Sequence, residues 1–143
     1  MKYISIAIVV AASCLCASVY PSQAFPQASN ADSTVKNGSP FVCDRLALTS
    51  DLRKRHFDVL EPQLRSMKTG VRELPDGYEF SFPPDRATFE LVAEWVIQER
   101  VCCPFFDIDL RLEREGGPLW MRLTGRPGTK EFMKVDGKAW IKQ

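Results

Sequence analysis

The chain has 143 residues, and its 19 basic residues are nearly balanced by 18 acidic ones. This balance excludes the strong positive field with which nucleic-acid-binding proteins attract their ligand, and the length allows about one domain. Apolar residues make up 45% of the chain and charged residues 26%, a composition typical of a globular protein with a packed core.

The first residues have the pattern of an export signal. Lys2 precedes an apolar run at 4–19, and small residues follow at Ser22-Gln23-Ala24. Because the apolar run is shorter than the ~20 residues of a membrane span, we expect a signal peptide over residues 1–24 and no membrane span in the mature chain. The sequence therefore predicts an exported protein, periplasmic or secreted.

Cysteine usage narrows the functional classes. Cys14 follows Ala11-Ala12-Ser13, which is close to a bacterial lipoprotein cleavage box, so a lipid anchor at Cys14 is an alternative to simple cleavage. Cleavage at the predicted site leaves Cys43, Cys102 and Cys103. In an oxidising compartment, three cysteines form either one disulfide with a spare thiol or a set of thiolates kept reduced by something that they bind.

The folded part is expected to begin near residue 41. Residues 25–40 are rich in Ser, Asn, Pro and Gly without an apolar period, so they predict a disordered spacer before a single domain at 41–143. A cap at Thr49 begins a first helix, which Pro62 either kinks or ends. His56, the one histidine of the chain, falls in the apolar stripe of this helix.

Two β-hairpins and two further helices follow. Alternating apolar and polar residues around a Pro-Asp-Gly turn predict a first hairpin over 71–82 with one buried face. Asp85 caps a second helix that runs to about Cys103, where a proline closes it. A second alternating pair of segments predicts another hairpin over 106–124, and a short helix is expected at 129–134.

The order α-β-β-α-β-β-α predicts an α+β fold, with helices on one face of an antiparallel sheet of about four strands. The order of the strands is not readable, and residues 135–143 show no clear pattern. We expect solvation rather than ligand binding for the charged side chains on the other sheet face, which are Arg72, Glu79, Asp107, Asp109, Arg111 and Arg122.

The segment E-R-V-C-C-P-F-F, residues 99–106, is the candidate site. At about 100° per residue, Cys103 falls near the centre of the buried stripe of the second helix and Cys102 at its margin. Cys102 is therefore expected to be the accessible cysteine. Glu99 lies on the buried side, where a carboxylate needs a partner; an ion pair with an arginine of the first helix and a functional role are both open.

The soft ligands of the mature chain suggest a metal site. Cys43, His56, Cys102 and Cys103 supply three sulfurs and one nitrogen, a set that suits zinc, and its sulfurs suit softer ions such as Cu(I), Hg(II) or As(III). We expect a domain that binds a metal ion or small thiophilic ligand rather than an enzyme, with Glu99 orienting a ligand. Two alternatives stay open. One is a non-catalytic interaction module with a disulfide from Cys43, and the other is a thiol-dependent redox protein with Cys102 as its reactive group.

Several segments together resemble a group of small bacterial proteins that share an E-R-x-C-C-P-F segment. They are C-D-R-L-A-L-T with R-K-R-H downstream, R-E-L-P-D-G-Y-E-F, E-W-V-I-Q-E-R-V-C-C-P-F-F and G-P-L-W-M-R-L-T-G. The resemblance covers roughly residues 43–132 and includes every candidate ligand. The group has no established activity, so the resemblance implies a shared domain and no particular reaction.

Overall fold

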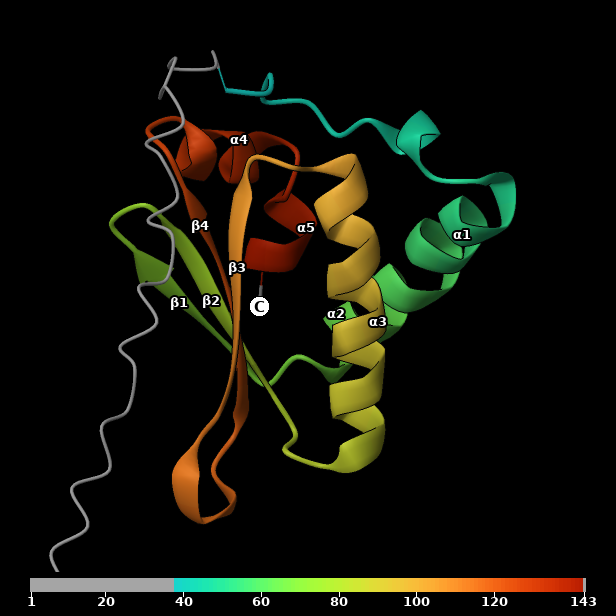
Figure 1. The fold of residues 1–143 in the computed structure, drawn as a ribbon. Coiled ribbons are helices and arrows are strands. Elements are labelled where there is room, and N and C mark those ends of the chain that lie inside the picture. Colours follow the sequence, from blue (N-terminus) through green and yellow to red (C-terminus); the bar gives the residue numbers. More distant parts are fainter. Residues whose placement is uncertain (1–37, 143) are drawn as a thin grey trace, which may run out of the picture. The chain divides into compact units, whose positions relative to one another are not determined.

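The computed structural model describes residues 38–142, so the predicted signal peptide, Cys14 and most of the predicted spacer lie outside it. The described residues form helices and a four-stranded antiparallel sheet, which confirms the predicted α+β class. The strands pair in the order β1-β2-β4-β3, with bounds β1 (Gly70–Leu74), β2 (Gly77–Phe82), β3 (Phe106–Leu112) and β4 (Leu119–Gly125). Figure 1 shows the sheet nearly edge-on with the helices gathered on one side of it.

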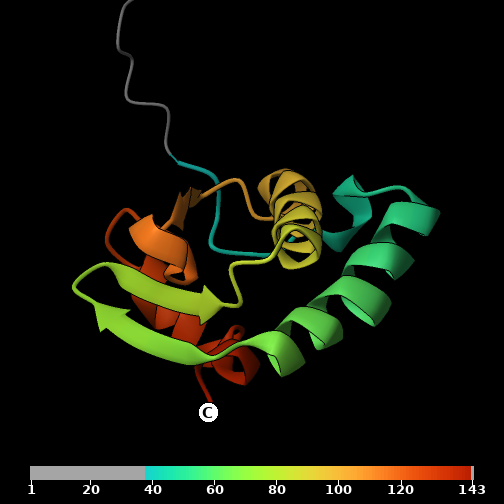
Figure 2. The ribbon, with the colours of Figure 1, turned by 90° about the horizontal axis from the view of Figure 1, so that it is seen from below.

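The helices account for most of the remaining described chain. They are α1 (Ser50–Lys54), a π-helical turn (Arg55–Leu60), α2 (Glu61–Met67), α3 (Arg86–Cys102), α4 (Thr129–Val135) and α5 (Lys138–Ile141). Figure 2, seen from below, separates α3 from the long rod formed by α1, the π-helical turn and α2. Among the described helices, none combines the length and the apolar character that crossing a bilayer requires.

The first helical rod passes through Pro62 without ending there. Its start is as predicted, because the Thr49 side chain accepts a hydrogen bond from the Leu52 amide. Pro62 has no amide hydrogen to donate within an α-helix. The preceding turn widens instead, and the Glu61 amide donates to the carbonyl oxygen of His56, five residues back. Such wide turns are frequent at functional sites, and here the turn carries His56.

The second long helix, α3, also begins at its predicted cap. The Thr88 amide donates to Oδ1 of Asp85 at 3.0 Å. The helix buries Val92 and Trp95 against the sheet and ends at Cys102, one residue before the predicted end. This end is where the candidate site lies.

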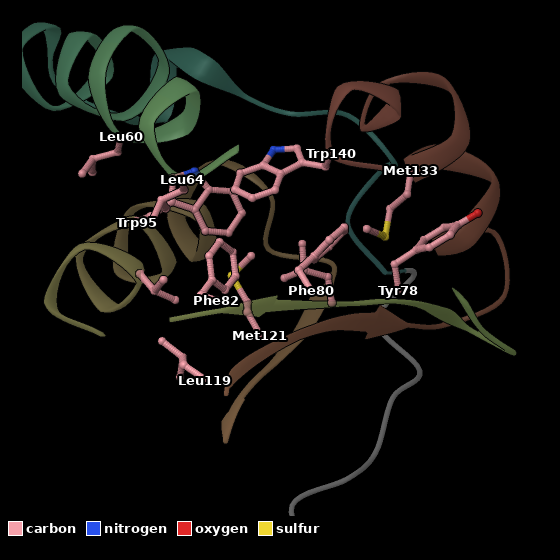
Figure 3. Packing of buried hydrophobic residues seen from close by; sticks show 12 residues of the cluster. Leu60, Leu64, Tyr78, Phe80, Phe82, Trp95, Leu119, Met121, Met133 and Trp140 are labelled. Atoms are coloured by element: carbon pink, nitrogen blue, oxygen red, sulfur yellow. The ribbon is translucent and has the colours of Figure 1, made fainter. Parts of the chain in front are cut away.

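The main core lies between the sheet and the helices, and its C-terminal part was not predicted from the sequence (Figure 3). The Trp140 ring of α5 lies 5.5 Å from the Phe80 ring and 5.1 Å from the Trp95 ring. Lys68 donates hydrogen bonds to the carbonyl oxygens of Trp140 and Lys142. The helix α5 is too short to show an apolar period, and the packing of Trp140 together with the hydrogen bonds from Lys68 holds it in place.

The opposite sheet face is less exposed than the alternating pattern predicts. All residues of β2 are buried, so the prediction of one buried face is wrong for this strand. Glu79 is only 2% exposed, because Arg72 and Arg122 lie opposite it on the neighbouring strands. Its carboxylate lies 2.8 Å from the Arg72 guanidinium and 3.7 Å from those of Arg111 and Arg122. The arginine stems cover this carboxylate while their charges neutralise it.

Candidate functional site

The two adjacent cysteines converge at the C-terminal end of α3. Cys102 is the last helical residue, and Cys103 leaves the helix with φ −126° and ψ 65°. Because the chain turns here, the two sulfurs are not separated by the angle between neighbouring helix positions. Both side chains are buried, with exposures of 0% and 2%. The prediction that Cys102 is the accessible cysteine is therefore wrong.

The segment before α1 covers this helix end and brings in the third cysteine. In Figure 1 the segment from residue 38 to α1 runs across the end of α3. The Asp44 amide donates to the carbonyl oxygen of Cys102 at 2.8 Å. This bond places Cys43 beside the pair, and the sulfurs of Cys43, Cys102 and Cys103 all lie within 4.8 Å of one another. The three are free thiols in the structure, and Cys43 is the half-exposed one.

A second group of ligand atoms shares Cys102. His56 Nε2 lies 2.9 Å from Glu99 Oε2, and the Cys102 thiol donates to the same oxygen at 3.4 Å. Of the two roles left open for Glu99, the ion pair with an arginine of the first helix does not form: the partner of Glu99 is His56, and Arg55 donates two hydrogen bonds to Glu94 at 2.8 and 2.7 Å. Glu99 thus connects the imidazole to the thiol cluster.

The predicted set of three sulfurs and one nitrogen is divided in the structure. Cys43, Cys102 and Cys103 form one compact group, and His56, Glu99 and Cys102 form another. His56 is 1% exposed and stacks on the Trp95 ring at 5.4 Å. Its Nδ1 has no hydrogen-bond partner within residues 38–142.

The thiols differ in their readiness to lose a proton. Hydrogen bonds from the thiols of Cys102 and Cys103 lower the pKa of Cys43 far below its usual range, and the nearby His56 and Arg45 act in the same direction. The pKa of Cys103 is raised, because it donates hydrogen bonds to Cys102 and Cys43 and is buried. For Cys102, the hydrogen bond from Cys103 favours the thiolate, but the bond to Cys43, burial and the charge of Glu99 together raise its pKa.

One negative charge, centred on the half-exposed Cys43, is the state that these interactions favour. Thiolates are both the nucleophiles and the metal ligands of cysteine chemistry. The cluster therefore presents one ligand that is ready to bind and two that become ligands once their protons leave.

A cavity of about 420 Å³ opens beside the cluster, with Cys43, Cys103 and Glu99 in its wall. Five of the twelve other residues in its wall are aromatic. Sequence analysis missed this cavity because its aromatic residues come from four helical segments and a strand, and each by itself fits an ordinary core position. It also missed the accessibility of Cys43, which no local pattern around that residue indicates.

Comparisons of the chain with known protein families, curated proteins and solved structures found no match. A functional assignment therefore depends on the chemistry of the site itself.

Proposed function

We propose that the domain binds a soft metal or metalloid ion through the sulfurs of Cys43, Cys102 and Cys103. The observation that carries the proposal is the position of the three sulfurs, all within 4.8 Å of one another at one helix end. Residues far apart in the chain reach this arrangement through the hydrogen bond between Asp44 and Cys102.

The kind of ion follows from the ligands. Thiolates select soft ions over hard ones. Structural zinc takes four protein ligands, whereas the compact group here has three sulfurs, and the nearby imidazole belongs to the other group. A three-coordinate thiophilic ion, such as As(III) or Hg(II), suits this set better than structural zinc.

Glu99 and His56 support the same chemistry. Metal binding requires Cys102 to lose its proton, and Glu99 Oε2 already accepts the hydrogen bond from that thiol. His56 lies on the same carboxylate oxygen. We assign to this pair the transfer of the Cys102 proton away from the cluster. Binding of the ion by His56, Glu99 and Cys102 is the second candidate arrangement, since their ligand atoms also lie within 4.8 Å of one another.

A titration of the reduced mature chain with arsenite tests the proposal. Arsenous acid and three thiols give an arsenic trithiolate and three water molecules, so we expect one arsenic per chain and the loss of all three free thiols. C43S, C102S and C103S should each lose this complex, whereas H56Q should keep its stoichiometry. A wild-type chain that binds no thiophilic ion, with its three thiols shown to be reduced, would contradict the proposal.

The competing proposal is a thiol-dependent redox protein, and the structure changes which cysteine it would use. The half-exposed Cys43, rather than the buried Cys102, is the sulfur that an oxidant or a disulfide can reach. A stable disulfide from Cys43 after purification from its native compartment would favour this alternative or a structural disulfide.

We retain export as part of the proposal, and cell fractionation with N-terminal sequencing of the mature chain tests it.

A further inference from the structure

The cavity beside the thiol cluster has a composition that metal binding alone does not explain. An inorganic ion needs only the sulfurs, yet this cavity of about 420 Å³ lies within the range of about 300–1,000 Å³ typical of sites for organic ligands. Its wall includes five aromatic side chains, which are Phe57, Trp95, Phe106, Phe132 and Trp140.

The sulfurs and the aromatic rings face the same space. Cys43 and Cys103 contribute to the cavity wall, whereas Cys102 does not. Cys102 lies behind them, against Glu99. A ligand in the cavity therefore meets two of the three sulfurs, and the third is directed toward the carboxylate.

The charged residues at the cavity disfavour an anionic ligand. Arg45, Glu61 and Asp136 line it together with Glu99, so acidic side chains outnumber the basic one. The Arg45 guanidinium lies 3.9 Å from the centre of the Phe57 ring, where that ring already engages its charge. An uncharged aryl group avoids repulsion from these carboxylates and can pack against the aromatic side chains of the wall.

We infer that the site takes aryl derivatives of a trivalent thiophilic element, with Cys43 and Cys103 on the element and the aryl group among the aromatic side chains. This inference rests on the proposed function and specifies its ligand. Phenylarsonous acid is an example: it reacts with two thiols to give a dithiolate and two water molecules. The carbon–arsenic bond stays intact, and no oxidant or reductant is needed. A two-thiol ligand leaves Cys102 free.

The structure offers a matched pair of variants for the test. The Phe132 and Phe41 rings both pack edge-on against Phe105, with ring centres 4.8 and 5.3 Å away. Of these two phenylalanines, Phe132 lines the cavity and Phe41 does not. F132A should therefore weaken binding of an aryl ligand, whereas F41A removes a similar contact near the cluster and should not.

The experiment measures the affinities of the reduced mature chain for phenylarsine oxide, a methylarsonous acid probe and arsenite. The ratio of the phenyl to the methyl affinity is divided by the same ratio measured for dithiothreitol, which removes the intrinsic difference between the two probes. We expect this corrected ratio to be at least about ten, because aromatic contacts contribute on that scale. F132A should remove most of this preference and leave arsenite binding unchanged. C102S should lose the three-thiol arsenite complex and keep phenylarsine oxide.

The outcomes separate the two proposals. If the wild-type chain binds none of the three probes, the proposed function itself fails. If arsenite binds but the corrected phenyl preference is absent, the inference is overturned and the proposed function stands. The phenyl-to-methyl ratio uses the wild-type chain, so it decides the matter even if F132A does not fold.

Discussion

Removing one member of the buried His56–Glu99 pair should destabilise the domain strongly, and removing both should cost less. The two groups are 2.9 Å apart, with side-chain exposures of 1% and 9%. Breaking a buried pair by removing one partner costs about 3–5 kcal/mol, because the other group stays buried without compensation. H56L and E99L should each lower the free energy of unfolding by about that amount, and this free energy is about 5–15 kcal/mol for a typical domain.

The double variant H56L/E99L should be more stable than either single variant, since replacing both members of a buried pair with apolar groups is often neutral or stabilising. Urea unfolding of the reduced, ion-free chain measures all three free energies. The Arg55–Glu94 pair is the control, because it joins the same two helices but is 38% and 37% exposed. Its double-mutant cycle should give at most about 1 kcal/mol. Costs of H56L and E99L that simply add in the double variant would refute this account of the pair.

Three further predictions concern the thiols, the sheet face and the C-terminal helix. The lowered pKa of Cys43 keeps this thiol ionised when the pH falls below about 8.5, the ordinary thiol pKa. Its alkylation rate should therefore stay nearly constant as the pH falls below that value. A tenfold fall in the rate per pH unit would contradict this. E79Q should lower the free energy of unfolding in urea by about 1.5 kcal/mol. This is the low end of the range for hydrogen bonds to charged groups, because the arginines around Glu79 are half exposed. The exposed E113Q should stay within about 0.5 kcal/mol of wild type, and equal effects would contradict the burial argument. W140A should cost about 3–5 kcal/mol by emptying the space between α5 and the core, and an unchanged midpoint would contradict that packing.

Much of the fold was predictable because its signals are local. The caps at Thr49 and Asp85 begin helices through hydrogen bonds within a few residues of each cap. Alternation over the hairpins likewise depends on neighbouring residues. The helix α5 was not predictable, because its order comes from Trp140 packing on Trp95 and Phe80, residues distant in the chain.

Residue types in the sequence pointed to the five candidate side chains, but not to their arrangement, which divides them into two groups that share Cys102. If helical periodicity is continued to Cys103, the sulfurs of Cys102 and Cys103 are predicted to point in different directions. The helix ends at Cys102 instead, and the backbone turn brings the two sulfurs together. Exposure could not be predicted either, since Cys102 is covered by a segment that begins far from it in the sequence. The partner of Glu99 was the histidine rather than an arginine, because the widened turn before Pro62 directs His56 toward α3.

The most direct test of the central claim is the X-ray absorption spectrum of the arsenite-loaded, reduced mature chain, measured at the arsenic edge. We expect a first shell of three sulfur neighbours and no nitrogen or oxygen, from Cys43, Cys102 and Cys103. The same spectrum of C43S should show a sulfur replaced by oxygen or no bound arsenic at all. A wild-type first shell with two sulfurs, or with a nitrogen from His56, would contradict the three-sulfur site.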